Sequence, residues 1–205
     1  YLIDFVRDEY RILRVIDRNI KPVNFHFTAT TNKAAGVLSD MLQAPAQTIH
    51  SALGLVLRQE RNGSGTYLEQ KNEPVSLNHS VLVIDEASMV NSELLEKVRD
   101  TAKKHKDCKI LYVGDSYQLP PVKENTCPMF SRTEDVYFLS EIQRQAAGNP
   151  IIAFSHQYRE ILDNPQTPWP KIPNDRSNVF HYTDPAEWRK ALKGAYLNTH
   201  DPAEL

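Results

Sequence analysis

The feature that most restricts the fold is a run of four apolar residues, Val81 to Ile84, that ends in the adjacent acids Asp85 and Glu86. A strand that is apolar at every position is typical of a strand buried on both faces, because a half-exposed strand alternates apolar and polar residues. Helical spacing of apolar residues follows from about residue 91 to residue 104. A buried strand followed by a helix predicts the α/β class, in which helices cover a parallel sheet.

The same order recurs along the chain. A strand is predicted at Val23–Phe27 and is followed by apolar residues at helical spacing over residues 37–42. Another strand is predicted at Lys109–Val113, and residues 2–16 carry apolar residues on one helical face. This repetition predicts a doubly wound α/β fold with a parallel sheet and helices on both faces.

Two further segments set the expected domain organisation. Asn62-Gly63-Ser64-Gly65, between apolar residues 55–57 and 67–68, predicts a β-hairpin inserted at about residues 58–80. A helix predicted over 151–162 is followed by a proline-rich stretch, then by a strand over 179–182 and a helix that begins near Asp184. We therefore expect a main domain over residues 1–162, and a linker with a strand and a helix over residues 163–205.

Composition restricts the class of protein and its surroundings. The 205 residues are 40% hydrophobic, enough for one sizeable core, and a net charge of -2 gives no overall attraction to nucleic acid. The two cysteines are too few and too far apart for a disulfide framework or a paired zinc motif, which favours a reducing, cytoplasmic setting. No apolar stretch is long enough for a membrane span, so we expect a soluble protein without a membrane partner.

Asp85 and Glu86 are the first candidate chemical groups. Ligands of open α/β sheets bind at the carboxyl ends of the strands, where this pair lies. In a nucleotide-hydrolysing site, the first acid can hold Mg²⁺ and the second can orient the attacking water. An isolated acidic pair equally suits the simpler role of capping the next helix.

A second polar segment, Gly114-Asp115-Ser116-Tyr117-Gln118-Leu119-Pro120-Pro121, follows the strand at 109–113. By itself it suits a turn with a proline stop. A glutamine here can also hydrogen-bond a terminal phosphate or the attacking water, while the prolines stiffen the connection. Together with the acidic pair, this segment favours a phosphate-handling site.

These segments resemble motifs II and III of superfamily 1 helicases, particularly the RecD/Dda-like branch. Thr28–Ala35 is similar to motif Ia of that family, Thr48–Ser51 to its TIHS segment, and Leu139–Gln145 to the segment that carries an arginine for the γ-phosphate. The similarity covers residues 1–162 and implies a RecA-like P-loop NTPase fold. It also implies an ATP-dependent, 5′-to-3′ DNA helicase that uses ATP and Mg²⁺.

The resemblance implies a role for each nucleotide-site residue. Asp85 would hold Mg²⁺, and Glu86 would be the general base. Gln118 would sense the γ-phosphate, Asp115 would lie against the nucleotide, and Arg144 would stabilise charge on the transferred phosphoryl group. Taken alone, Arg144 suits a surface salt bridge equally well.

The resemblance also implies two groups of DNA-facing residues: Thr30, Thr31 and Asn32, and Thr48, His50 and Ser51. Hydroxyls and amides at the start of a helix can bind backbone phosphates without reading sequence. The same residues suit plain helix caps, and the histidine suits a packed position. Relatives usually carry proline, threonine and histidine at the first group, so the departure here weakens the assignment of Asn32.

In related helicases, a β-hairpin at the position of the insertion helps to split the duplex. The resemblance therefore implies contact with a duplex junction, and Tyr67 is the candidate wedge nearest the tip. A solvated surface hairpin is an equally good interpretation of the sequence.

The loop G-x-x-x-x-G-K-[ST], which cradles phosphates in this class, does not occur in the 205 residues. In the family it comes just before the first helix, so we expect that loop to precede Tyr1 in the natural protein, and a second motor domain to follow. We also expect these residues alone to hydrolyse ATP poorly and not to unwind DNA.

Two other classes of function remain open. A degenerate motor domain could bind single-stranded DNA or a replication or recombination protein without hydrolysis. A metal-dependent nuclease could use Asp85, Glu86 and Asp115, but that idea does not account for the segment from Gln118 to Pro121. The sequence does not choose among replication, recombination and repair.

Overall fold

The structure is a computed structural model that describes residues 2–60, 65–122, 124–131, 135–139, 150–171 and 180–198. Its contacts divide the chain into a compact unit of residues 1–137 and a second unit of residues 138–205. The first unit carries the sheet and most of the candidate site.

Four parallel strands form the sheet of the first unit: β1 (Asn24–Ala29), β2 (Ala46–Thr48), β5 (Ser80–Asp85) and β6 (Cys108–Tyr112). Their order is β2-β1-β5-β6. Ala29 lies opposite Thr48 on one side and Asp85 on the other. The strands therefore bring their carboxyl ends to one edge, as the sequence predicted.

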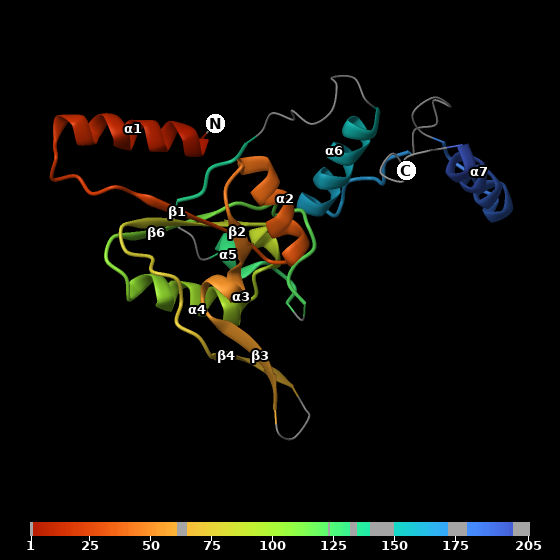
Figure 1. Cartoon of the computed structure of the whole chain (residues 1–205). Coiled ribbons are helices and arrows are strands. Elements are labelled where there is room, and N and C mark those ends of the chain that lie inside the picture. Colours follow the sequence, from red (N-terminus) through yellow and green to blue (C-terminus); the bar gives the residue numbers. More distant parts are fainter. Residues whose placement is uncertain are drawn as a thin grey trace. The chain divides into compact units, whose positions relative to one another are not determined.

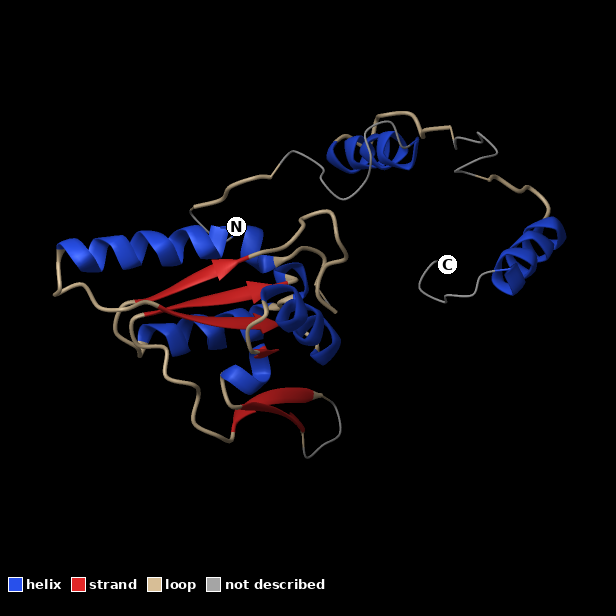
Figure 2. Ribbon diagram, turned by 45° about the horizontal axis from the view of Figure 1, so that its top comes forward, coloured by secondary structure: helices blue, strands red, loops and turns tan. Residues whose placement is uncertain are grey.

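Helices cover both faces of this sheet. Figures 1 and 2 show α1 (Leu2–Ile16) and α4 (Ser92–Lys103) on opposite faces. On the α4 face, Leu82, Ile84, Leu95 and Val98 are all fully buried in one apolar core. On the other face, the Arg7 guanidinium of α1 lies 5.4 Å from the ring centre of Phe25 in β1. The predicted α/β parallel sheet with helices on both faces is confirmed.

Shorter elements connect the strands at the carboxyl edge. Helix α2 (Asn32–Leu42) follows β1, and the single turn α3 (Ile49–Ala52) follows β2. The 3₁₀ turn η1 (Ala87–Met89) follows β5, and α5 (Pro128–Ser131) comes after β6. The sequence predicted α2 but neither η1 nor strand β2.

A hairpin is present and projects from the sheet (Figure 1), but it spans residues 55–70 and not the predicted 58–80. Its strands β3 (Leu55–Gln59) and β4 (Thr66–Gln70) are antiparallel, with Leu57 opposite Leu68. Gly54 begins the hairpin with a φ of 65°, and a Cβ there would collide with the Asn72 carbonyl oxygen. The tip, residues 61–64, lies outside the described residues.

The second unit contains two helices in its described part, α6 (Pro150–Asp163) and α7 (Pro185–Asn198). Asp184 caps α7 by accepting a hydrogen bond from the Ala186 amide at 2.8 Å, and the helix begins where the sequence predicted. The strand predicted over residues 179–182 is wrong for 180–182, which form no strand, while Val179 lies outside the described residues. A β-branched and aromatic composition does not make a strand unless a neighbouring strand pairs with it.

Among the helices that the structure describes, none combines the length and the apolar character needed to cross a membrane.

Candidate active site

The ends of β5 and β6 form the centre of the candidate site. The Val113 amide donates to the Ile84 carbonyl at 2.8 Å, and the Ala87 amide donates to the Val113 carbonyl at 2.9 Å. These bonds extend the pairing of the two strands past their last residues. As a result, the segments that carry Asp85, Glu86 and Asp115 leave the sheet side by side.

Glu86 has an unusual backbone conformation. Its φ of 53° and ψ of 39° lie in the left-handed region, at the point where the chain turns from β5 into η1. A side chain other than glycine is strained there, and such strain concentrates at functional sites because it must be supported by the surrounding structure. The candidate general base thus lies on a sharp turn that its neighbours hold in place.

Gln118 is connected to the η1 turn. The Ser88 hydroxyl donates to Gln118 Oε1 at 3.3 Å, and the Gln118 amide donates to the Asp115 carbonyl at 3.2 Å. A Cβ added to Gly114 would lie 3.0 Å from the Ser88 nitrogen, so the two segments pack closely. A displacement of Gln118 would therefore also displace the turn that carries Glu86.

A cavity and carboxylates that could bind a metal ion lie beside this pair of segments. A cavity of about 420 Å³ is lined by Gln118, Pro120 and Cys127, among others. No cluster of three metal-ligating side chains occurs in the part of the chain that the structure describes. Because Mg²⁺ usually takes only one or two carboxylates and completes its shell with waters and substrate phosphates, Asp85 at the end of β5 fits that role, and the nucleotide contact of Asp115 stays a prediction.

The candidate DNA-facing residues after β1 have structural roles in this conformation. Thr31 caps α2, with its hydroxyl oxygen accepting from the Ala34 amide at 3.1 Å. The Thr30 hydroxyl contacts Met89 Sδ at 3.8 Å, which joins the end of β1 to the η1 turn. Asn32 is the exposed first residue of α2. The capping role is observed for Thr31, and contact with DNA stays a prediction for all three.

The residues after β2 are arranged in the same way. Thr48 caps α3 by accepting from the Ser51 amide at 3.1 Å, and the Ser51 hydroxyl donates to Gln47 Oε1 at 3.1 Å. His50 is half-buried. Burial lowers the pKa of its imidazole, and the nearby Glu93 carboxylate partly opposes that shift. The imidazole is therefore neutral near pH 7, which suits hydrogen bonding or stacking better than charge pairing with phosphate.

Two acids for which no sequence motif predicts a site role hold these parts together. Glu93 Oε1, in the first turn of α4, accepts from the Leu68 amide of the hairpin at 2.9 Å. The Glu124 carboxylate accepts from the Ser92 amide at 2.7 Å and from the Ser92 hydroxyl at 3.2 Å. The start of α4 thus connects the hairpin to the segment that follows Gln118. No local motif could have revealed these contacts, because the partners lie 25 and 32 residues apart.

The structure therefore groups the candidate residues by strand. Asp85, Glu86, Asp115 and Gln118 lie at the adjoining ends of β5 and β6, and the two threonine-containing groups lie at the ends of β1 and β2. Arg144 lies outside the described residues.

Comparison with known proteins gives a family match. A model of the family described as "AAA domain" matches residues 11–162, which is most of the chain.

Three relatives are similar to this chain, and two of them are helicases by name. The chain is 32% identical over 130 residues to the ATP-dependent RecD2 DNA helicase of Deinococcus radiodurans, covering 62% of this chain and 16% of the relative. It is 27% identical over 165 residues to RecBCD enzyme subunit RecD of Buchnera aphidicola subsp. Schizaphis graminum, covering 70% of this chain and 26% of the relative. It is 30% identical over 133 residues to the ATP-dependent DNA helicase PIF1 of Emericella nidulans, covering 60% of this chain and 16% of the relative.

A solved structure, Bacteroides Pif1 bound to ssDNA, aligns with 93% of this chain and 50% of its own chain, at 21% identity and a TM-score of 0.48. The chain spans only 16% to 26% of the length of the three relatives named above.

Proposed function

Since the chain belongs to the AAA-domain family and is similar to RecD- and Pif1-like superfamily 1 helicases, we propose that its carboxyl-edge site acts in ATP hydrolysis. In the intact protein, hydrolysis would drive 5′-to-3′ translocation along single-stranded DNA and unwinding of the duplex. The observation that carries the proposal is the Ser88–Gln118 hydrogen bond, which joins the segments bearing Glu86 and Gln118.

The residues of β5 and β6 would divide the chemistry. Asp85 would hold Mg²⁺, which supplies charge neutralisation at the β- and γ-phosphates. Glu86 would accept a proton from the attacking water, and its strained turn keeps that carboxylate at the strand end. Gln118 would hydrogen-bond the γ-phosphate, and Arg144 would stabilise its developing charge. Asp115, which anchors the turn that holds Gln118, would lie against the nucleotide.

Single-stranded DNA would pass along the ends of β1 and β2. Thr30, Thr31 and Asn32 would contact backbone phosphates through hydroxyl and amide groups, and so would Thr48 and Ser51. The neutral imidazole of His50 favours a hydrogen bond or a stacking contact with a base. The capping bonds of Thr31 and Thr48 would fix the positions of these two side chains before DNA arrives.

The hairpin would meet the duplex junction. Tyr67 lies on β4 next to the tip and is exposed, which suits a side chain that stacks on the terminal base pair. Deleting the hairpin from the intact protein should abolish unwinding and leave DNA-stimulated ATP hydrolysis in place. Unwinding at the original rate after the deletion would show that the hairpin is only a surface feature.

The test of the main proposal is ATP hydrolysis by the intact protein, with and without single-stranded DNA, compared between the native enzyme and a Glu86→Gln variant. Loss of a general base should lower kcat at least about 100-fold. A Glu9→Gln variant, which changes an exposed acid of α1, is the matched control and should keep its activity. DNA binding without hydrolysis in all three proteins would favour a degenerate binding module.

Other parts of the proposal follow from the same assignment. ATP and Mg²⁺ would be the cofactors, and replication or recombination proteins would be the protein partners. The site of action would be the compartment that holds the DNA. Metal-dependent DNA cleavage without ATP would instead support a nuclease.

A further inference from the structure

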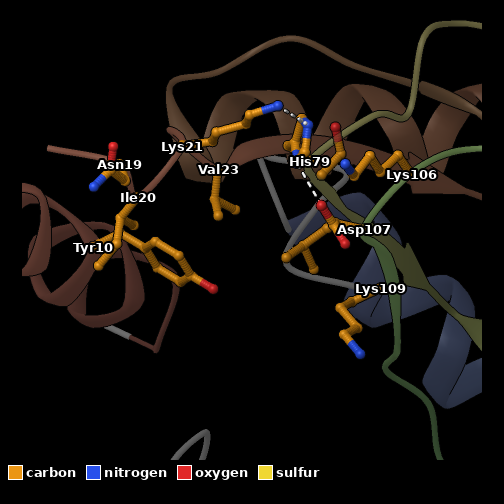
Figure 3. Close-up of a pocket in the computed structure, with 11 residues that line it drawn as sticks. Tyr10, Asn19, Ile20, Lys21, Val23, His79, Lys106, Asp107 and Lys109 are labelled. Carbon is orange, nitrogen blue, oxygen red and sulfur yellow. Dashed lines mark hydrogen bonds and ion pairs between the residues drawn. The ribbon is translucent and has the colours of Figure 1, made fainter. Parts of the chain in front are cut away.

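A second hollow lies at the amino ends of the same strands. It has a volume of about 370 Å³ and lies between the α1 segment and the starts of β5 and β6. Figure 3 shows Tyr10 and Asn19 on the α1 side, with His79, Lys106 and Lys109 on the strand side. Because β5 has six residues and a strand rises about 3.3 Å per residue, the two edges of the sheet are separated by roughly 16 Å. One small ligand could not fill both sites.

Positive charge is concentrated around this hollow. Lys21 comes from the connection between α1 and β1, Lys106 from the turn after α4, and Lys109 from β6. Asp107 is the one acid among the described lining residues, and its carboxylate already contacts His79 at 2.9 Å. The chain as a whole carries a net charge of -2, so this excess of ammonium groups is a local property.

A relay of side chains holds one of these ammonium groups in place. In the neutral tautomer with its proton on Nδ1, His79 donates to Asp107 Oδ2 at 2.9 Å, which leaves Nε2 as an acceptor. Lys21 Nζ lies 3.1 Å from that nitrogen and can donate to it. Figure 3 draws both contacts as dashed lines.

The histidine itself is fixed by its backbone. The His79 amide donates to the Lys106 carbonyl at 2.7 Å, and the His79 carbonyl accepts from the Asn24 amide at 3.0 Å. The Asn78 side chain accepts from the Lys106 amide at 2.8 Å. A free lysine loses conformational entropy when it binds a ligand, and these contacts reduce that cost for Lys21.

We propose that this amino-edge pocket binds a phosphoryl group at a site separate from the candidate active site. The oxyanions would accept hydrogen bonds from the ammonium groups of Lys21, Lys106 and Lys109. The Tyr10 hydroxyl and the Asn19 amide would add neutral donors. His79 is a positioning residue, because it acts on the ligand through Lys21.

Two sources could supply such a group: the phosphodiester backbone of nucleic acid, or a free phosphate such as pyrophosphate. The experiment uses the 205-residue chain and follows backbone amide NMR signals of His79, Lys106 and Lys109 during titration. One arm adds pyrophosphate, and the other adds a twelve-residue oligothymidine without terminal phosphates. The probe that binds more tightly identifies the source of the phosphoryl group. Saturable changes in the chemical shifts of these amides with either probe support the proposal.

The decisive variant is Lys106→Ala combined with Lys109→Ala, which should weaken binding at these amides at least about tenfold because two charge-assisted hydrogen bonds are lost. The control is Lys71→Ala combined with Lys97→Ala, which removes the same charge elsewhere and should leave the affinity unchanged. His79→Asn removes the acceptor for Lys21 while tolerating the left-handed backbone at φ 52°, and should weaken binding less.

Four outcomes would overturn the proposal. The first is that neither probe shifts the amino-edge amides, and the second is that the lysine variants and their controls bind equally well. Preferential binding of a polyglutamate peptide at the same amides would show an acidic-peptide site instead of a phosphoryl site. Shifts confined to residues 85–88 and 115–118 would place the anion at the carboxyl edge and would also count against the amino-edge pocket.

Discussion

At the scale of single residues, His50 shows how two opposing effects set the charge of a candidate DNA contact. Burial lowers the pKa of its imidazole, since the charged form loses hydration. The Glu93 carboxylate raises it, since a nearby negative charge favours the imidazolium form. Burial is the larger effect. Glu93 is also the acceptor for the Leu68 amide, so one carboxylate influences both the hairpin and the histidine.

A Glu93→Gln substitution should therefore move the pKa of His50 further down. The measurement is an NMR pH titration of the His50 ring signals in the native chain and the variant. Because the folded-state pKa lies below the unfolded one, His50 contributes stability that is present above about pH 6.5 and is lost as the pH falls below it. Glu96→Gln removes the same charge one turn later and is the control. A His50 pKa that rises, or that does not respond to the Glu93 change, would contradict this account.

At the scale of elements, the end of β6 and the η1 turn pack without spare room. A Cβ at Gly114 would lie 3.0 Å from the Ser88 nitrogen and 3.2 Å from the Ala87 nitrogen. Backbone atoms cannot rotate away as a side-chain tip can. Gly36 in α2 is the opposite case, since a Cβ there would meet nothing within 4 Å.

We expect Gly114→Ala to lower the free energy of unfolding by about 1–3 kcal/mol, the usual cost of overpacking. Gly36→Ala should raise it by about 0.5–1 kcal/mol, because alanine restricts the unfolded chain and favours the helix. Urea denaturation of the 205-residue chain measures both. Equal stability of the two variants would mean that the turn after β6 can shift to admit a methyl group.

Elements with a strong local pattern could be predicted from sequence. The buried run at residues 81–84 and the helical spacing after it identified β5 and α4. Strand β2 has only three residues, too few for a pattern, and it exists because it pairs with β1. The strand expected at 180–182 shows the converse, since suitable residues there form no strand.

The candidate site shows the same difference between local patterns and long-range contacts. Asp85, Glu86 and Gln118 could be proposed from sequence because each lies in a continuous motif at a strand end, and their roles stay predictions. The bonds from Ser88 to Gln118 and from Leu68 to Glu93 join residues 30 and 25 positions apart. Contacts of this kind depend on how elements pack together, so a reading of neighbouring residues does not show them.

At the scale of the whole molecule, the sheet separates two kinds of chemistry. The carboxyl edge gathers carboxylates and hydroxyls, which suit Mg²⁺, water and DNA backbone. The amino edge gathers ammonium groups around the Lys21–His79–Asp107 relay. Strand β5 runs between the two edges, and its residues Leu82, Val83 and Ile84 are among the most deeply buried of the described residues.

None of the seven glycines is followed by lysine, so these 205 residues contain no phosphate-binding loop of the G-x-x-x-x-G-K-[ST] form. That loop supplies the backbone amides and the lysine that cradle the phosphates. We therefore expect the purified 205-residue chain to show no ATP hydrolysis above background in a phosphate-release assay, with or without single-stranded DNA. A longer protein that carries such a loop together with these residues should hydrolyse ATP under the same conditions and is the positive control. Hydrolysis by the 205 residues that disappears in Glu86→Gln would contradict the expectation, because it would mean that the residues of β5 and β6 bind and cleave the nucleotide without the loop.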